Sequence, residues 1–186
     1  LNCRTGKTTS PCGVCDLCRK ITAGQSVDVI EIDAASNTGV DNIRGLNEQV
    51  GFAPVECRYR MFIIDEAHML SSGAFNALLK TLEEPPSHVV FVLATTEPHK
   101  IPATIHSRCQ HLQFRKLTMD EISGQLRHIA TEENISISDV GLRVLARNAS
   151  GCMRDAISLF DQVFSFKGSQ IEDADIQSML GAAGVD

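Results

Sequence analysis

The sequence predicts an α/β domain with a parallel sheet, followed by a small helical bundle. In the first two thirds of the chain, short apolar runs alternate with stretches of helical periodicity, which is typical of parallel strands joined by crossover helices. After Leu117 only helical periodicity remains. A cysteine-rich segment precedes both parts, so we divide the 186 residues into 1–22, 23–117 and 118–186.

The first segment carries four of the seven cysteines, Cys3, Cys12, Cys15 and Cys18. An odd total and no visible secretion signal argue against a disulfide framework. Four thiolates at this short spacing, in a loop with few apolar residues, predict a structural Zn²⁺ site. The alternative is a set of free or redox-active thiols.

The triplet Gly6-Lys7-Thr8 matches the last three positions of a phosphate-binding loop motif. That motif, G-x-x-x-x-G-K-[ST], needs a glycine where Leu1 stands, a strand before it and a helix directly after it. We therefore reject it and expect Lys7 to be an exposed charge on the cysteine loop. Because the chain begins with Leu1, we expect it to be a fragment whose N-terminal segment has been left off.

The first expected strand and helix follow this segment. Residues 27–32 alternate apolar and acidic side chains, which predicts a strand. A polar turn then places Asn37 or Thr38 to cap a helix over about 40–50.

Two apolar runs predict the next strands, with helices after each. Residues 61–64 form a short apolar run that ends in two acids, as expected of a buried parallel strand. Helical spacing over 71–84 is stopped by two prolines. A strand is expected at 89–94, a short helix at 101–107 and a last strand at 111–114.

The remaining residues predict a helical bundle. Thr118 and Glu121 have the spacing of a capping box, which opens the first helix. Further helices are expected at about 139–149, 152–166 and 172–180, with their apolar residues on one face.

Candidate catalytic residues lie where the expected strands end. Asp65 and Glu66 emerge from the second strand, and Thr95 and Thr96 follow the third. Because the carboxyl ends of parallel strands share one edge, these groups should meet in one crevice. Adjacent acids at such an edge suit Mg²⁺ binding and the activation of water.

Two arginines could neutralise phosphate charge near this edge. Arg108 follows the short helix at 101–107, and Arg154 lies on the first turn of the third bundle helix, pointing away from its core.

Together these features resemble the gamma/tau family of bacterial DNA polymerase III clamp-loader subunits, over essentially the whole chain. The motifs are the four cysteines, Ile30-Glu-Ile-Asp-Ala-Ala-Ser-Asn37, Asp65-Glu-Ala-His-Met-Leu70, Asn76-Ala-Leu-Leu-Lys-Thr-Leu-Glu-Glu-Pro-Pro86, Leu93-Ala-Thr-Thr96, Ser107-Arg-Cys109 and Arg154-Asp-Ala-Ile-Ser-Leu159. The resemblance implies an AAA+ domain with an inserted zinc module, followed by a helical lid.

The resemblance also implies residue roles. Asp65 would be the Mg²⁺-associated acid, Glu66 the catalytic base and Thr96 the sensor 1 residue. Arg108 would be an arginine finger acting on a neighbouring subunit, and Arg154 the sensor 2 residue beside the nucleotide. The four cysteines would be the zinc ligands.

The function implied is ATP hydrolysis, with Mg²⁺, coupled to loading the sliding clamp on primed DNA in the bacterial cytoplasm. The implied partners are the delta and delta-prime subunits and further gamma/tau copies within the polymerase holoenzyme. The family's phosphate-binding loop lies upstream of the zinc module, so we expect this chain to bind ATP poorly by itself.

Composition limits other functions. A net charge of −6 excludes capture of nucleic acid by the whole surface, and no apolar run approaches the ~20 residues that span a bilayer. A local contact with the DNA backbone is expected at Asn37, Thr38 and Arg44, although an ordinary helix cap explains that turn equally well.

Three alternatives remain. The chain could be a non-hydrolysing scaffold like delta-prime, a helicase with an Asp-Glu-Ala-His motif, or a protein whose cysteine loop binds nucleic acid. Retention of Asp65, Glu66 and Arg154 favours the ATPase over the scaffold. No helicase-like second domain follows Arg115, and only two aromatic residues, Phe52 and Tyr59, precede residue 61.

Overall fold

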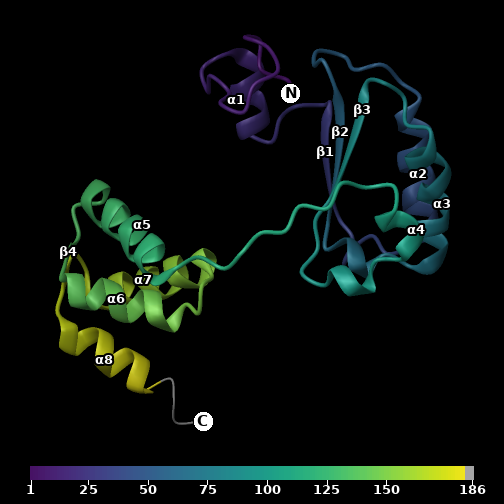
Figure 1. Ribbon diagram of the computed structural model, residues 1–186. Coiled ribbons are helices and arrows are strands. Elements are labelled where there is room, and N and C mark those ends of the chain that lie inside the picture. The colour runs from purple at the N-terminus through teal and green to yellow at the C-terminus, as the bar shows by residue number, and fades with distance from the viewer. Residues whose placement is uncertain (183–186) are drawn as a thin grey trace. The chain divides into compact units, whose positions relative to one another are not determined.

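The computed structural model describes residues 1–182, which fall into two compact units that divide between His111 and Leu112 (Figure 1). The division lies a few residues before the boundary expected after residue 117. Among the described residues, no helix combines the length and the apolar character needed to cross a membrane.

The first unit is built on a parallel three-stranded sheet in the order β1-β2-β3. The strands are β1 (Val29–Asp33), β2 (Arg60–Asp65) and β3 (Val89–Leu93). Their register aligns Ile30 with Phe62 and Phe62 with Phe91. The three strands expected from the apolar runs at 27–32, 61–64 and 89–94 are therefore confirmed, and all end at the same edge.

Helices cover one face of this sheet (Figure 1). They are α2 (Val40–Val50), α3 (Ser72–Glu83) and α4 (Ala103–His106), and short 3₁₀ turns lie at Ala67–Met69 and Pro98–Lys100. The core between these layers is fully buried at Phe62, Ile64 and Leu78.

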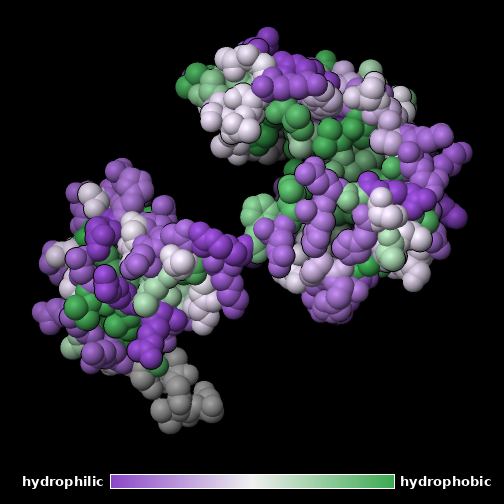
Figure 2. All heavy atoms as spheres, in the orientation of Figure 1, coloured by the Kyte–Doolittle hydropathy of each residue, from purple (hydrophilic) through white to green (hydrophobic). Residues whose placement is uncertain are grey.

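The opposite face of the sheet is apolar as well. Hydrophobic side chains gather over the strands in Figure 2, and Val92 on β3 is 39% exposed. Apolar residues on both faces are typical of parallel sheets, which are normally covered on both sides.

The cysteine segment is attached to the start of β2. It contains α1 (Asp16–Thr22), a helix that is absent from the elements expected above. The buried Asn2 donates from Nδ2 to the Tyr59 carbonyl and accepts from the Tyr59 N–H at Oδ1, both at 2.9 Å. The Asn2 amide thus satisfies both backbone polar groups of Tyr59, as a neighbouring strand would do for the residue that precedes β2.

Asp28 organises the loop that leads into β2. Its side chain is fully buried and accepts backbone N–H bonds from Val55, Glu56 and Cys57 at 2.8–3.1 Å. Burial alone would raise the pKa of this carboxyl, but those N–H groups and the charge of Arg60 outweigh it and hold the pKa below its usual range.

The Asp28→Asn substitution should lower the free energy of unfolding by about 1–3 kcal/mol, because an amide cannot accept all of these bonds. A depressed carboxyl pKa in the fold contributes stability above the unfolded-state pKa of about 4, and that stability is lost as the pH falls. Urea unfolding across the acid range should therefore show a flatter pH dependence for Asp28→Asn, while the exposed control Asp41→Asn should behave like the unmodified chain.

The second unit is a helical bundle with a short parallel bridge. Its elements are α5 (Met119–Glu132), β4 (Ser136–Ile137), α6 (Asp139–Asn148), α7 (Met153–Lys167), β5 (Gln170–Ile171) and α8 (Asp173–Ala182). Thr118 and Glu121 form the expected capping box. The four expected helices are confirmed, whereas β4 and β5 were not anticipated.

Two local predictions are wrong. Residues 111–114 do not form a strand; Leu112 and Phe114 are 66% and 91% exposed. Their alternating pattern suits a strand, but no described strand pairs with them, and an unpaired strand leaves its backbone groups unsatisfied. The N-cap of α2 is Gly39 rather than Asn37 or Thr38, because the Asn37 side chain donates instead to the Asp33 carbonyl at 3.0 Å.

Candidate functional site

Asp65 and Glu66 stand where β2 leaves the sheet. Glu66 has a left-handed backbone, with φ 46° and ψ 44°, which is uncommon for a residue with a side chain. Its N–H donates to Asp65 Oδ1 at 2.9 Å, and the next N–H, of Ala67, donates to the Ala94 carbonyl at 2.8 Å. This sharp turn exposes the Asp65 carboxylate at the carboxyl edge of the sheet.

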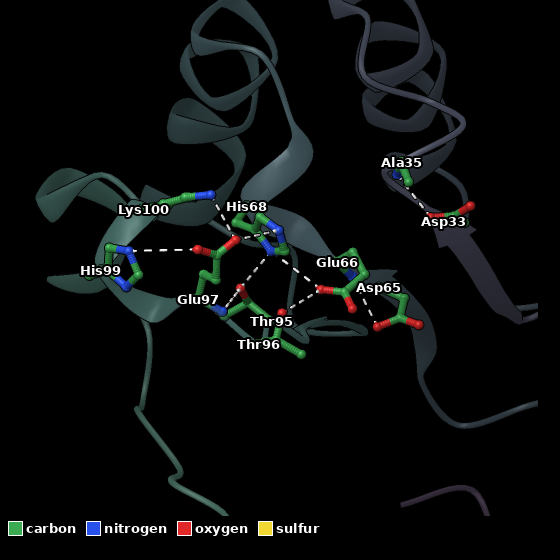
Figure 3. A network of polar contacts seen from close by, with 10 residues as sticks. All are labelled: Asp33, Ala35, Asp65, Glu66, His68, Thr95, Thr96, Glu97, His99 and Lys100. Carbon is green, nitrogen blue, oxygen red and sulfur yellow. Dashed lines mark hydrogen bonds and ion pairs between the residues drawn. The ribbon is translucent and has the colours of Figure 1, made fainter. Parts of the chain in front are cut away.

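The residues after β3 meet the same turn, as Figure 3 shows. The Thr96 hydroxyl donates to Glu66 Oε2 at 3.2 Å, so the structure brings together these two residues that the sequence placed in one crevice. His68 Nδ1 lies 3.0 Å from Thr95 Oγ1 and 3.3 Å from Glu66 Oε2. Its other nitrogen, Nε2, lies 3.2 Å from Glu97 Oε2.

Glu97 is held by cations in the loop after β3. Lys100 donates to its carboxylate at 2.7 Å, and this bond, with the charges of Lys100, His68 and His99, holds the pKa of Glu97 below its usual range. Glu97 therefore carries its negative charge at neutral pH. We call the connected set Glu66, His68, Thr95, Thr96, Glu97 and Lys100 the His68 network.

Arg108 lies just beyond α4 and is turned toward its own chain. Its guanidinium donates to the Glu83 carboxylate at 2.5 Å and to the Thr104 carbonyl at 2.8 Å. Both partners in the ion pair are partly exposed, with 33% of the Arg108 side chain and 48% of Glu83 accessible. A pair this exposed is worth about 1 kcal/mol or less, so a phosphate could replace Glu83 at little cost.

The other expected site residues are at exposed or partly exposed positions. Arg154 is exposed on the first turn of α7, in the second unit. Asn37 and Thr38 lie in the loop between β1 and α2, and Arg44 on α2 is exposed and pairs with Asp41 at 3.0 Å.

The structure brings together the four cysteines of the first segment, Cys3, Cys12, Cys15 and Cys18. Their sulfur atoms all lie within 4.8 Å of one another, while sulfurs around a tetrahedral zinc are roughly 3.8 Å apart, given Zn–S bonds of ~2.3 Å. The cluster is thus close to the geometry of a four-thiolate site, and a small contraction would complete it.

Hydrogen bonds and burial change the pKa values of the thiols in this cluster. The N–H of Cys12, followed by the Thr5 hydroxyl, lowers the pKa of Cys3 to about 6. At Cys18 a backbone bond at Gly13 favours the thiolate, but the neighbouring Cys15 sulfur and burial prevail and raise the pKa to about 12. Four thiolates this close together would repel one another. A divalent cation bound between them would neutralise that negative charge.

Lys7 behaves as an exposed charge on the cysteine loop. Its ammonium lies 4.8 Å from the centre of the Tyr59 ring, and the first helix after it, α1, begins only at Asp16. This arrangement supports the rejection of Gly6-Lys7-Thr8 as a phosphate-binding loop, which requires a helix directly after the lysine.

Sequence reasoning missed Glu83, Glu97 and the role of His68. Two weak signals were present: His68 follows Glu66 by two residues, and Thr95 precedes Thr96. Neither spacing reveals that the turn at Glu66 brings these side chains into contact.

Two family models match this chain, one over all of the first unit and one over most of the second. A model described as DNA polymerase III, delta subunit, matches residues 1–118, and one for the ATPase lid domain of the DNA polymerase III clamp loader subunit matches residues 121–168.

Known relatives agree with these models. The tau subunit of DNA polymerase III from Bacillus subtilis is 51% identical over 182 residues, which cover 98% of this chain and 32% of that protein. The tau subunit of Escherichia coli is 51% identical over 181 residues, covering 97% of this chain and 28% of that protein. The chain thus spans about a third of the length of these relatives.

Solved structures support the fold. Thermotoga maritima RuvB, a Holliday junction branch migration motor, matches with a TM-score of 0.71 at 17% identity, over 91% of this chain and 57% of that chain. This likeness confirms the expected fold, a parallel-sheet α/β domain followed by a helical unit, and the second family model describes that unit as an ATPase lid domain. Because the first family model alone matches 118 of the 186 residues, the chain belongs to the DNA polymerase III clamp-loader subunit family.

Proposed function

We propose that this chain forms part of an ATPase subunit of the bacterial clamp loader, which uses ATP to load the sliding clamp on primed DNA. The observation that carries this proposal is the pair Asp65 and Glu66 at the carboxyl edge of the sheet, with Thr96 bonded to Glu66. Ligands of open α/β sheets bind at this edge.

The residues divide the work of hydrolysis between them. Asp65 would hold Mg²⁺, and its exposed carboxylate suits a hard cation that keeps most of its water. When bound, Mg²⁺ neutralises charge on the phosphates. Glu66 would accept a proton from the attacking water, and Thr96 would orient Glu66 and sense the nucleotide.

The two arginines would act on phosphate charge. Arg108 would serve a neighbouring subunit's nucleotide, and Arg154 in the lid unit would contact the nucleotide of its own subunit.

ATP binding itself should need residues outside these 186. Within them no G-x-x-x-x-G-K-[ST] motif occurs, so the backbone N–H groups and lysine that hold phosphates are missing. Titration with a fluorescent ATP analogue should show weak binding to this chain, and tight binding with hydrolysis when its natural upstream segment is included. Micromolar binding by the 186 residues alone would contradict this division.

We propose further that Cys3, Cys12, Cys15 and Cys18 hold a structural Zn²⁺. The sulfur cluster supports this assignment, and the segment has few buried apolar residues of its own, so metal binding would supply much of its order.

Metal analysis should return one zinc per chain, and Cys15→Ser should lose it, because three thiolates hold the ion less firmly than four. Cys152→Ser, at an exposed cysteine outside the cluster, is the matched control and should retain the zinc. Four freely titrating thiols in the purified protein would refute the assignment.

The proposed partners are the delta and delta-prime subunits, further gamma/tau copies, the sliding clamp and primed DNA, all in the bacterial cytoplasm. A backbone phosphate of DNA would be contacted by Asn37, Thr38 and Arg44, near the start of α2.

A non-hydrolysing scaffold like delta-prime is the second candidate, because the family model for residues 1–118 is named for a delta subunit. Asp65 and Glu66 favour the ATPase. Absence of hydrolysis by the full-length protein in an assembled loader would favour the scaffold.

A further inference from the structure

His68 is a nearly buried polar side chain in the middle of the candidate site. Only 8% of its side chain is exposed, and it has polar partners on both sides of the ring (Figure 3). Thr95 and Glu66 lie at Nδ1, and Glu97 lies at Nε2. Among the described residues the clustered metal-binding groups are the four cysteines alone, so His68 is not part of a ready metal site.

The ring is oriented from its far side. Glu97 carries a negative charge and can only accept, so the 3.2 Å contact makes Nε2 the donor. Glu97 is itself fixed, since its carboxylate accepts from Lys100 and its N–H donates to Thr95 Oγ1 at 3.0 Å. With Nε2 held in this way, Nδ1 faces Thr95 and Glu66. Because the Glu66 carboxylate can only accept, Nδ1 can bond to it only as a second donor, in the doubly protonated ring.

Glu66 depends on such support. Its backbone sits in an uncommon left-handed conformation, and its side chain is 37% exposed. Within residues 1–182, the Thr96 hydroxyl and the His68 ring both contact its Oε2, at 3.2 and 3.3 Å. Without one of them the carboxylate could rotate toward solvent and away from its position beside Thr96 at the carboxyl edge of the sheet.

We propose that His68 is a positioning residue for Glu66, held in place by Glu97. The proposal rests on the proposed ATPase function. A misplaced general base slows the chemical step without weakening ligand binding, so loss of the His68 ring nitrogens should reduce kcat by about 10- to 100-fold. KM for ATP should stay nearly constant.

Two substitutions separate positioning from packing. His68→Phe fills the ring volume but removes both nitrogens, whereas His68→Asn is smaller and keeps a polar group where Nδ1 stands. In the full-length protein, positioning predicts that His68→Asn retains more kcat than His68→Phe. A packing role predicts the reverse order.

A coupling test addresses Glu97. Glu97→Gln should lower kcat when His68 is present and change nothing further in the His68→Phe background, because Glu97 acts through the ring. Without nucleotide, the ¹⁵N-histidine spectrum of the full-length protein should show an exchange-protected Nε2 proton of His68 that becomes exposed to exchange in Glu97→Gln.

Control variants separate the proposed role of His68 from the proposed ATPase activity on which it depends. His128→Ala removes an exposed histidine of α5, in the second unit, and should leave kcat unchanged. Nucleotide affinity and melting temperature show whether each variant is folded. If the wild type hydrolyses ATP and Glu66→Gln does not, equal kcat values for wild type and His68→Phe overturn the role of His68 alone. If the wild type does not hydrolyse ATP, the ATPase proposal fails and this inference fails with it.

Discussion

Full-length subunits that carry Arg108→Ala should lose about 10³-fold or more in ATP hydrolysis when they are assembled only with one another. An arginine finger stabilises charge that develops on the transferred phosphoryl group in the transition state, which accounts for an effect of this size. The guanidinium is available for that task because its present partner, Glu83, holds it through a half-exposed ion pair. The measurement is the steady-state ATPase rate of the assembled loader.

Mixing decides where the arginine acts. An Arg108→Ala subunit should hydrolyse its own ATP when an intact neighbour supplies the arginine to that site. Arg127→Ala is the matched control, since Arg127 is also an exposed arginine paired with a carboxylate, Asp139, at 2.7 Å. If Arg108→Ala sites stay inactive beside wild-type neighbours arranged to complement them, the arginine acts within its own subunit.

The second large effect is expected for Glu66→Gln in the full-length protein, which should slow hydrolysis by about 10²- to 10⁴-fold. The amide keeps the shape of the side chain and can still accept the Thr96 hydroxyl bond, but it cannot take a proton from water. Nucleotide affinity should therefore change little, and single-turnover kinetics should locate the loss in the chemical step.

A mixed assembly gives the opposite result to that for Arg108. Glu66→Gln sites should remain inactive whatever their neighbour, because the base acts on water in its own site. Glu84→Gln, at an exposed acid at the end of α3, is the control and should leave the rate unchanged. Strong loss of nucleotide binding in Glu66→Gln would show that Glu66 holds the ligand rather than the water.

The order of elements could be predicted because it depends on local patterns. Apolar runs gave β1, β2 and β3, and the capping box at Thr118 and Glu121 gave the start of α5. The segment at 111–114 failed because strand formation requires a partner, and alternation along one segment does not supply it.

The site could be predicted only in part. Parallel strands end at a common edge, so Glu66 and Thr96 were expected to meet. The position of His68 depends on the left-handed backbone at Glu66, which no propensity for glutamate indicates. Likewise, the ion pair between Glu83 and Arg108 joins residues 25 positions apart and follows from how α3 and α4 pack.

The pairing of Asn2 with Tyr59 has a consequence for the order of folding. The two residues are 57 positions apart, whereas the four cysteines span only residues 3–18. Because loop closure costs more entropy in longer loops, by about 1 kcal/mol between these two lengths, the cysteine cluster is the cheaper contact to form first. The cluster is a local contact and the Asn2 bonds are long-range ones, which require the start of β2 to be in place. The segment should therefore gather its sulfurs during early folding and attach to the sheet late, so that slow attachment rather than metal capture limits the last step.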